Sequence, residues 1–185
     1  MTPTELIDQI VLSYGQIGGR RDDIFDWTKE ILREVETVLQ PEYTLSTSTH
    51  TLSGATTLTV SDTISIVSVA HNDGNSVLHP ITRTHFDSLS SETPACMFYY
   101  AQQTPDGHTI YFNSSPTDNV VVRSRIYTDL GSDPDTDSPA LDHLFPIILQ
   151  GLHAKVALVL KDLDRYKAED LHYRTMLGQL PQVSK

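Results

Sequence analysis

Three aspartates at alternate positions, Asp133, Asp135 and Asp137, are the first candidates for a chemical site in this sequence. An EF-hand calcium loop begins with this spacing, but it also needs glycine at its sixth position and glutamate at its twelfth. Those two positions hold Ser138 and Leu144. We therefore interpret the run as a solvated acidic linker that leads into a helix, and we expect no metal site here.

The eight histidines do not have the spacing of a metal site. His79 and His85 flank a five-residue segment, and His143 and His153 lie on one expected helix. None belongs to a His-x-x-x-His or His-Glu-x-x-His pattern, in which two rings share one face of a helix. We expect ordinary surface or half-buried histidines and predict neither a metal nor a cofactor.

No pattern in the sequence predicts an activated nucleophile or a phosphate loop. There is no Gly-x-Ser-x-Gly elbow, and Cys96 follows Pro94 next to an aromatic strand, where a lone thiol behaves as a small apolar group. The glycine-rich segment 15–20 lies between two expected helices and lacks the Lys-Ser/Thr that binds phosphate. We therefore predict that the protein is not an enzyme.

Aromatic residues gather in two expected strands and give one alternative function. An aromatic face of this kind is more often the core side of a sheet, but it can also stack against a sugar ring. The residues concerned are Phe98, Tyr99, Tyr100, Tyr111 and Phe112. The alternative is a β-sandwich carbohydrate-binding or host-binding module that uses Tyr99, Tyr100 and Tyr111 as stacking residues.

Composition limits the partners that the chain can have. The chain has 185 residues, 13 basic and 24 acidic, and a formal net charge of −11 with neutral histidines. Such a balance argues against binding to nucleic acid or to anionic membranes, because both favour lysine and arginine. The single cysteine excludes a disulfide framework within one chain. The length favours one domain or two small ones.

Periodicity divides the chain into helical ends and a strand-rich middle. Apolar residues recur at helical spacing in residues 1–40 and 139–180, and Ser138 with Pro139 is a typical helix start. Between them lies a Ser/Thr-rich stretch with alternating apolar residues, which favours strands. The expected strands lie at 56–60, 64–69, 77–81, 97–101, 108–112 and 120–127.

This pattern predicts an α+β fold. Flanking N- and C-terminal helical hairpins form a helix bundle from residues 1–42 and 139–185. A β-domain of residues 43–138 is inserted between them as an antiparallel β-sandwich or open barrel of about six strands. We expect most of the acidic surface to belong to this β-domain and its loops, because residues 40–140 sum to −8.

The order of these parts resembles the head–tail adaptor (connector) proteins of tailed bacteriophages, including the tubular collar proteins of short-tailed phages. The resemblance covers most of the chain and depends on the order of the elements and on short segments of sequence. The segments that carry this resemblance are Ile64–Val69, Leu78–Leu89, Thr93–Tyr100, Gly107–Pro116, Val120–Tyr127 and Ile148–Lys155. The Thr/Ser-rich stretch 44–59 and the absence of a proline after Lys161 depart from the family pattern.

The resemblance implies a structural virion protein of the neck that is assembled in the host bacterial cytoplasm. Members form a homo-oligomeric ring, typically a dodecamer, which docks beneath the portal protein and offers its other face to tail or nozzle proteins. DNA passes through the lumen only as cargo, and no membrane is involved. A negative charge suits such a lumen, because it does not hold the DNA phosphates.

The end of the chain is our candidate for the portal-docking element. Its apolar residues are Met176, Leu177, Leu180, Pro181 and Val183, and the alternative is that they simply end a helix. Deleting residues 178–185 from a subunit that still folds is expected to abolish portal binding.

Overall fold

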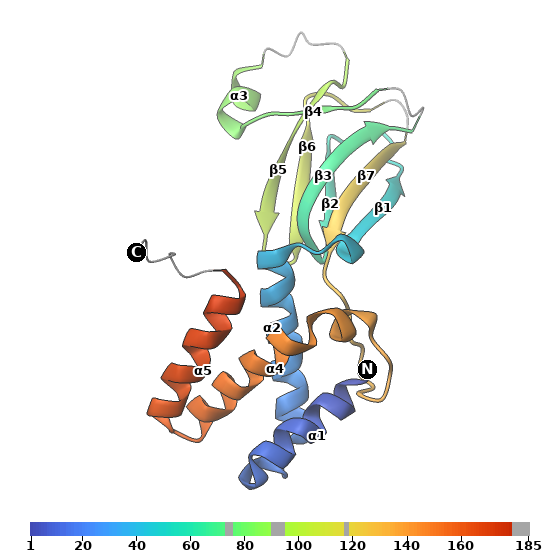
Figure 1. The fold of residues 1–185 in the computed structure, drawn as a ribbon. Helices are drawn as coiled ribbons and strands as arrows, with labels where there is room; N and C mark the ends of the chain where they lie inside the picture. The colour runs from blue at the N-terminus through green and yellow to red at the C-terminus, as the bar shows by residue number, and fades with distance from the viewer. Residues whose placement is uncertain (73–75, 90–94, 117–118, 179–185) are drawn as a thin grey trace. The chain divides into compact units, whose positions relative to one another are not determined.

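The computed structural model describes residues 1–72, 76–89, 95–116 and 119–178, and they form two compact units. One unit is helical and combines residues 1–40 with residues 128–185, and the other is a β-unit of residues 41–127. Each unit has its own hydrophobic core. The predicted α+β fold, with helices at both ends of the chain, is confirmed (Figure 1).

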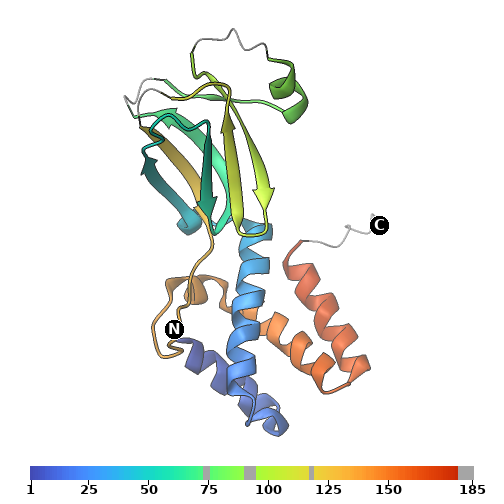
Figure 2. The same ribbon diagram turned by 180° about the vertical axis from the view of Figure 1, so that it is seen from behind.

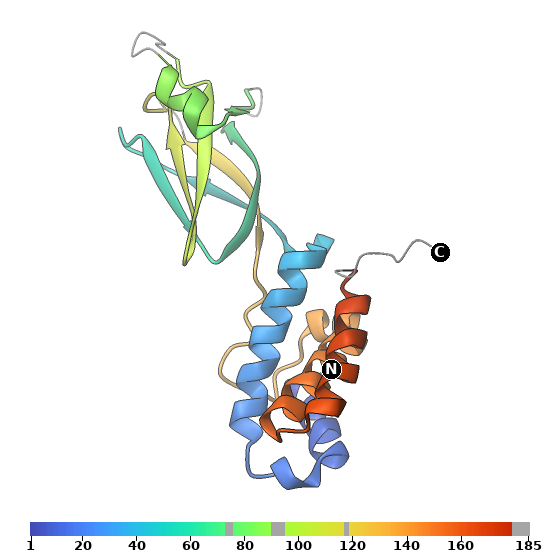
Figure 3. The same cartoon turned by 90° about the vertical axis from the view of Figure 1, so that its left-hand side faces the viewer.

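The helical unit contains four α-helices and one short 3₁₀ turn. These are α1 (Pro3–Ser13), η1 (Gly15–Ile17), α2 (Arg21–Leu39), α4 (Pro139–Val159) and α5 (Leu163–Met176). Helix α1 has a capping box, in which the Thr2 side chain and the Glu5 side chain each accept a hydrogen bond from the other's backbone N–H. The pair α1–α2 and the pair α4–α5 lie against each other in one unit (Figure 3).

Helix α4 is the centre of the helical unit. Both α2 and α5 pack against it, and it lies between them in the two opposite views (Figure 2). Its broad apolar surface accounts for this position, since Leu141, Ile148, Leu152 and Val156 are all fully buried. The helix begins at Pro139 with Ser138 as its N-cap, as predicted, but the Ser138 side chain is buried and makes no capping hydrogen bond.

The β-unit consists of two open sheets, and its described strands do not close into a barrel. One sheet has the order β1-β7-β3 and the other β2-β6-β5-β4. The strands are β1 (Leu45–His50), β2 (Thr57–Ser61), β3 (Thr63–His71), β4 (His79–Pro80), β5 (Phe98–Thr104), β6 (Gly107–Phe112) and β7 (Val120–Ile126). The sheets share one core, to which Val60, Val69, Tyr99, Ile110 and Val122 contribute from five different strands.

Three features of the β-unit differ from the sequence-based prediction. Strand β1 was not predicted, because its half-buried alternate positions hold Ser46, Ser48 and His50 rather than the apolar residues that reveal a half-buried strand. A short 3₁₀ turn, η2 (Glu42–Thr44), and a short helix, α3 (Arg83–Ser88), are additional. The sheets are not wholly antiparallel, since β4 pairs with β5 in parallel.

The predicted domain boundary at residue 138 is corrected to residue 127. Residues 128–138 belong to the helical unit because they bond to both of its N-terminal helices. The backbone N–H of Thr4 donates to the Pro134 carbonyl at 3.0 Å, and the Thr128 backbone N–H donates to the Glu36 carboxylate at 3.0 Å. Leu130 is buried in the helical core.

The acidic surface is also distributed differently from the prediction. Within the seven strands the only charged side chains are Arg123 and Arg125, both in β7, and no strand contains an aspartate or a glutamate. Among the described residues of the β-unit, the carboxylates lie in turns, in η2 and in α3, and four further aspartates lie in the linker 128–138, which belongs to the helical unit.

Candidate functional site

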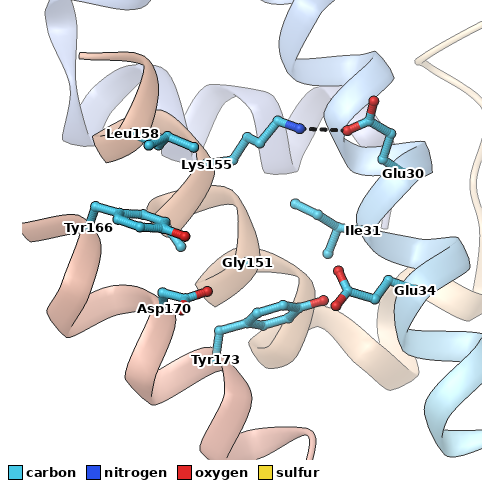
Figure 4. Close-up of a pocket in the computed structure, with 10 residues that line it drawn as sticks. Glu30, Ile31, Glu34, Gly151, Lys155, Leu158, Tyr166, Asp170 and Tyr173 are labelled. Atoms are coloured by element: carbon cyan, nitrogen blue, oxygen red, sulfur yellow. Dashed lines mark hydrogen bonds and ion pairs between the residues drawn. The ribbon is translucent and has the colours of Figure 1, made fainter. Parts of the chain in front are cut away.

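A groove in the helical unit lies where α2, α4 and α5 meet (Figure 4). Its volume is about 160 Å³. Helix α2 contributes Glu30, Ile31 and Glu34, helix α4 contributes Gly151, Ala154, Lys155 and Leu158, and helix α5 contributes Tyr166, Asp170 and Tyr173. The groove therefore combines apolar, aromatic and charged side chains from both ends of the chain.

Gly151 forms the floor of the groove. A Cβ atom at this position would lie 2.9 Å from Ile31 Cγ2 and 3.0 Å from Tyr173 Cε2. The absent side chain lets α2 and α5 approach α4 on either side of this point. The groove thus depends on one small residue in a helix that is otherwise broadly apolar.

Two of the groove's three carboxylates are already paired with basic side chains. Lys155 Nζ lies 2.7 Å from Glu30 Oε2, and Arg174 Nε lies 2.8 Å from Asp170 Oδ2. The third carboxylate, Glu34, is exposed and forms no ion pair with any residue in the described part of the chain. Glu34 therefore leaves the groove with an uncompensated negative charge.

Tyr173 brings a buried polar atom to the same place. Its side chain is 5% exposed, and its hydroxyl group forms no hydrogen bond of standard geometry within the described residues, although Glu34 is near enough to interact with it. Figure 4 shows this hydroxyl directed toward the Glu34 carboxylate. Burial raises the pKa of the Tyr173 phenol, and the nearby negative charge of Glu34 raises it further. The phenol is therefore neutral, and its hydroxyl can both donate and accept a hydrogen bond.

The groove is suited to binding one cationic side chain. Small-molecule pockets usually enclose about 300–1,000 Å³, so a volume of about 160 Å³ holds a side chain better than a cofactor. A free carboxylate, a neutral hydroxyl and two tyrosine rings are the groups that favour a guanidinium or an ammonium.

A second cavity, of about 330 Å³, lies where η1 meets the turn between α4 and α5. The guanidinium of Arg165 lies 4.1 Å from the centre of the Tyr14 ring, and the Tyr14 hydroxyl lies 3.2 Å from both the carbonyl oxygen and Nδ1 of His153. Burial lowers the pKa of His153. These three side chains already satisfy one another, so they join α1, α4 and α5 rather than present a free site.

The predicted portal-docking residues are only partly described by the structure. Met176 is half-buried at the end of α5, and Leu177 is buried in the helical core with 4% exposure. As placed, Leu177 belongs to the packing of the helical unit and is not presented to a partner. Leu180, Pro181 and Val183 lie outside the described residues.

The aspartate run 133–137 anchors the N-terminus. Asp137 lies 3.2 Å from the Met1 ammonium, and Asp135 Oδ1 accepts a hydrogen bond from Thr4 Oγ1 at 2.6 Å. Asp133 Oδ1 accepts from the Asp135 backbone N–H. The three carboxylates therefore have separate partners instead of sharing one centre.

The predicted histidine and cysteine candidates are also spread over different environments. His79 lies in β4 and His85 in α3, whereas His143 is exposed and His153 half-buried on α4. Cys96 is a free, half-buried thiol whose pKa is raised by burial. Among the residues that the structure describes, no three histidine, cysteine, aspartate or glutamate side chains gather into a metal-binding group.

The aromatic platform of the alternative function is divided between two faces of its sheet. Tyr99 is buried in the core of the β-unit. Tyr100 and Tyr111 stack on each other with ring centres 4.6 Å apart, and Phe86 of α3 packs edge-on against Tyr100 at 4.9 Å. The three proposed stacking residues therefore do not form one surface.

Sequence reasoning did not identify the groove. Glu30 and Glu34 at spacing i, i+4 and a lone glycine within a broad apolar helix were its only local signals. Tyr173 follows Glu34 by well over a hundred residues, and no pattern in the sequence pairs them.

None of the helices described by the structure has both the length and the apolar character needed to cross a bilayer. A scan of the sequence against models of known protein families finds no match. A search of curated proteins finds no significant relative either.

Proposed function

We propose that this protein is a head–tail connector adaptor of a tailed bacteriophage. In this role it forms a ring beneath the portal protein, joins the portal to the tail and surrounds the channel through which DNA leaves. It acts as a structural protein of the virion neck and not as an enzyme. Its ring is assembled in the host bacterial cytoplasm, with a dodecamer as the expected state.

The observation that supports this proposal most is the organisation of the chain. Residues 1–40 and 128–178 meet in one helical unit, and a separate β-unit is inserted between them. The adaptor proteins that the sequence resembles have the same order of helical hairpin, strands and helical hairpin. Two units with independent cores also suit a protein that must contact a portal and a tail with different surfaces.

Charge supports the same role. A ring subunit needs two unlike surfaces, because a closed rotation brings a different patch to each side. The chain has a net charge of −11, yet its strands carry two arginines and no carboxylate. The arginines of the strands and the carboxylates of the other segments therefore lie in different parts of the chain, while the overall negative charge disfavours a grip on DNA.

The direct test is to image the protein with the portal protein of the same phage. Native mass measurement and negative-stain microscopy of the full chain, alone and mixed with the portal ring, are expected to show a closed ring on the underside of the portal. A chain that stays monomeric and does not bind the portal would contradict the proposal.

A deletion locates the portal-docking element. Since Leu177 is buried in the core, the deletion should begin after Gly178 and remove residues 179–185 only. We expect the shortened chain to fold, with the same cooperative thermal unfolding as the full chain, and to lose portal binding. Replacing residues 179–185 with a Gly/Ser segment of equal length controls for length, and unchanged portal binding by the deleted chain would contradict this assignment.

The carbohydrate-binding alternative is distinguished by ligand and oligomeric state. A sugar-binding module is expected to bind a glycan as a monomer, whereas an adaptor binds none. A glycan array screened with the full chain decides between them. The burial of Tyr99 leaves this alternative with fewer exposed stacking residues than the sequence suggested.

A further inference from the structure

The groove between α2, α4 and α5 has two polar groups that a further basic group could bind, beside Lys155, which already pairs with Glu30. Glu34 is an exposed carboxylate with no ion pair among the described residues, and the buried Tyr173 hydroxyl is directed toward it without a hydrogen bond of standard geometry. A buried hydroxyl without a partner costs free energy, so such a group is expected to be satisfied in the functional state. A guanidinium meets both needs, because its five N–H donors can bond to a carboxylate and a hydroxyl at once.

The β-unit carries an arginine that lacks a partner. Arg123 is exposed on β7, the middle strand of its sheet, and forms no ion pair or hydrogen bond within the described residues. Its neighbours across the two adjacent strands are Thr47 and Ser68, which are uncharged. Arg125, two residues later, differs because its guanidinium donates to the Pro41 carbonyl at 2.8 Å.

We propose that the groove of one copy of this chain receives Arg123 of a second copy. The guanidinium pairs with the Glu34 carboxylate and bonds to the Tyr173 hydroxyl, and the tyrosine rings lie beside it. The proposal rests on the ring assembly of the proposed function and specifies one of its contacts.

Charge complementarity is the reason for choosing a second copy as the partner. Two chains of net charge −11 repel each other unless their contact brings opposite charges together. The groove has an unpaired carboxylate, and the sheet β1-β7-β3 has arginines and no acidic residue. The contact joins two different surfaces, so a pair of copies still has a free groove on one copy and a free Arg123 on the other. The same contact can therefore repeat around a ring.

Charge reversal tests the contact on the full chain. Self-association is measured by sedimentation velocity over a range of protein concentrations, and ring assembly on the portal by negative-stain microscopy. Glu34→Arg and Arg123→Glu are each expected to weaken association by about tenfold or more. The double variant Glu34→Arg/Arg123→Glu restores the opposite charges and is expected to recover most of the association.

Two matched variants control for net charge. Asp22→Arg makes the same change at an exposed position in the first turn of α2 that does not line the groove, and Arg83→Glu reverses an exposed arginine in the β-unit. Both are expected to associate like the wild type. Mixing the two single variants gives a further check, because alternate copies can then meet through the native pair and through the reversed pair, so the mixture is expected to recover association that neither variant shows alone.

Tyr173→Phe tests the hydroxyl without removing the ring. This variant is expected to weaken association several-fold, whereas its thermal unfolding midpoint should be equal to or above that of the wild type. A hydroxyl with a purely structural role in the subunit would instead lower the midpoint and leave association unchanged.

The outcomes separate this contact from the proposed function. If the wild type forms a ring and neither charge reversal weakens it, or if the double variant fails to recover, the contact is wrong and the connector role remains. If the wild type forms no ring, alone or with the portal, both are wrong.

Discussion

At the scale of single residues, Glu36 is a fully buried carboxylate that holds the linker to helix α2. Its two oxygens accept hydrogen bonds from the backbone N–H of Thr128 at 3.0 Å and from Thr128 Oγ1 at 2.5 Å. Hydrogen bonds to a charged group contribute more than neutral ones. One side chain therefore fixes the position at which the chain returns from the β-unit to the helical unit.

We expect Glu36→Ala to lower the free energy of unfolding of the helical unit by about 2–3 kcal/mol, because it leaves two polar groups of Thr128 without their acceptor. The fluorescence of Trp27, the only tryptophan, reports on this unit during urea unfolding. Asp26→Ala removes an exposed carboxylate from the same helix and should change the free energy by less than about 0.5 kcal/mol. Equal effects of the two variants would contradict this role of Glu36.

His153 makes the stability of the helical unit depend on pH. Burial lowers its pKa in the folded chain, the positive charge of Arg165 lowers it further, and the Glu169 carboxylate partly opposes this effect. The unfolded chain then binds more protons than the folded one below the ordinary histidine pKa of about 6.5. Stability is therefore complete above that pH and falls as the pH drops toward the lowered value.

We expect the unfolding midpoint of the wild type to decrease between about pH 7 and pH 5, and His153→Gln to reduce this decrease. Thermal melts followed by Trp27 fluorescence over this interval measure it. His172→Gln, at an exposed position on α5, is the control and should keep the wild-type slope. An unchanged slope in His153→Gln would show that other groups cause the pH dependence.

At the scale of elements, helix α4 is packed on two sides because Gly151 provides room for both neighbours. The Ile31 side chain from α2 and the Tyr173 ring from α5 reach the same point on α4. An alanine would gain helix propensity, yet its Cβ would lie closer to both side chains than ordinary packing allows.

We expect Gly151→Ala to destabilise the helical unit by about 1–2 kcal/mol, since overpacking outweighs the gain in helix propensity. Gly19→Ala is the matched control, because a Cβ there meets nothing within 4 Å. That variant should be neutral or slightly stabilising. Urea unfolding followed by Trp27 fluorescence compares the two, and a stabilised Gly151→Ala variant would contradict this account of the packing.

Strand β1 shows why local patterns miss some elements. All six of its residues pair with β7 without a register shift, yet only Leu45 is apolar. Its stability comes from the ladder with β7 and not from a buried apolar face of its own. Hydrophobic alternation therefore detects β3 and β7, which contribute to the core, but not an edge strand of serine and threonine.

At the scale of the whole molecule, the β-unit is an insertion whose two ends lie close together. Its first strand, β1, pairs with its last, β7, and Arg125 bonds to the Pro41 carbonyl. The two points at which the insertion interrupts the helical unit also lie close together, because Glu36 in the last turns of α2 accepts a hydrogen bond from Thr128. The two cores share no residue.

We expect the helical unit to fold without the β-unit. A chain in which residues 41–127 are replaced by a short Gly/Ser linker should keep a helical circular dichroism spectrum, a Trp27 fluorescence spectrum like that of the full chain, and cooperative thermal unfolding. We expect this because its core and the Glu36–Thr128 hydrogen bonds are intact. A parallel chain that also carries Glu36→Ala should be less stable than the parent. An unfolded parent chain would show that the helical unit depends on the insertion.

The sequence by itself determined the four α-helices of the helical unit and most of the strands, because these follow from the apolar spacing of residues close together in the chain. It also determined the start of α4 at Pro139 and the net charge that limits the partners. Only the tertiary structure decided where the linker 128–138 belongs, and only it placed Glu34 next to Tyr173 in one groove. Contacts between residues so far apart depend on how the two ends of the chain pack, and no local spacing records that packing.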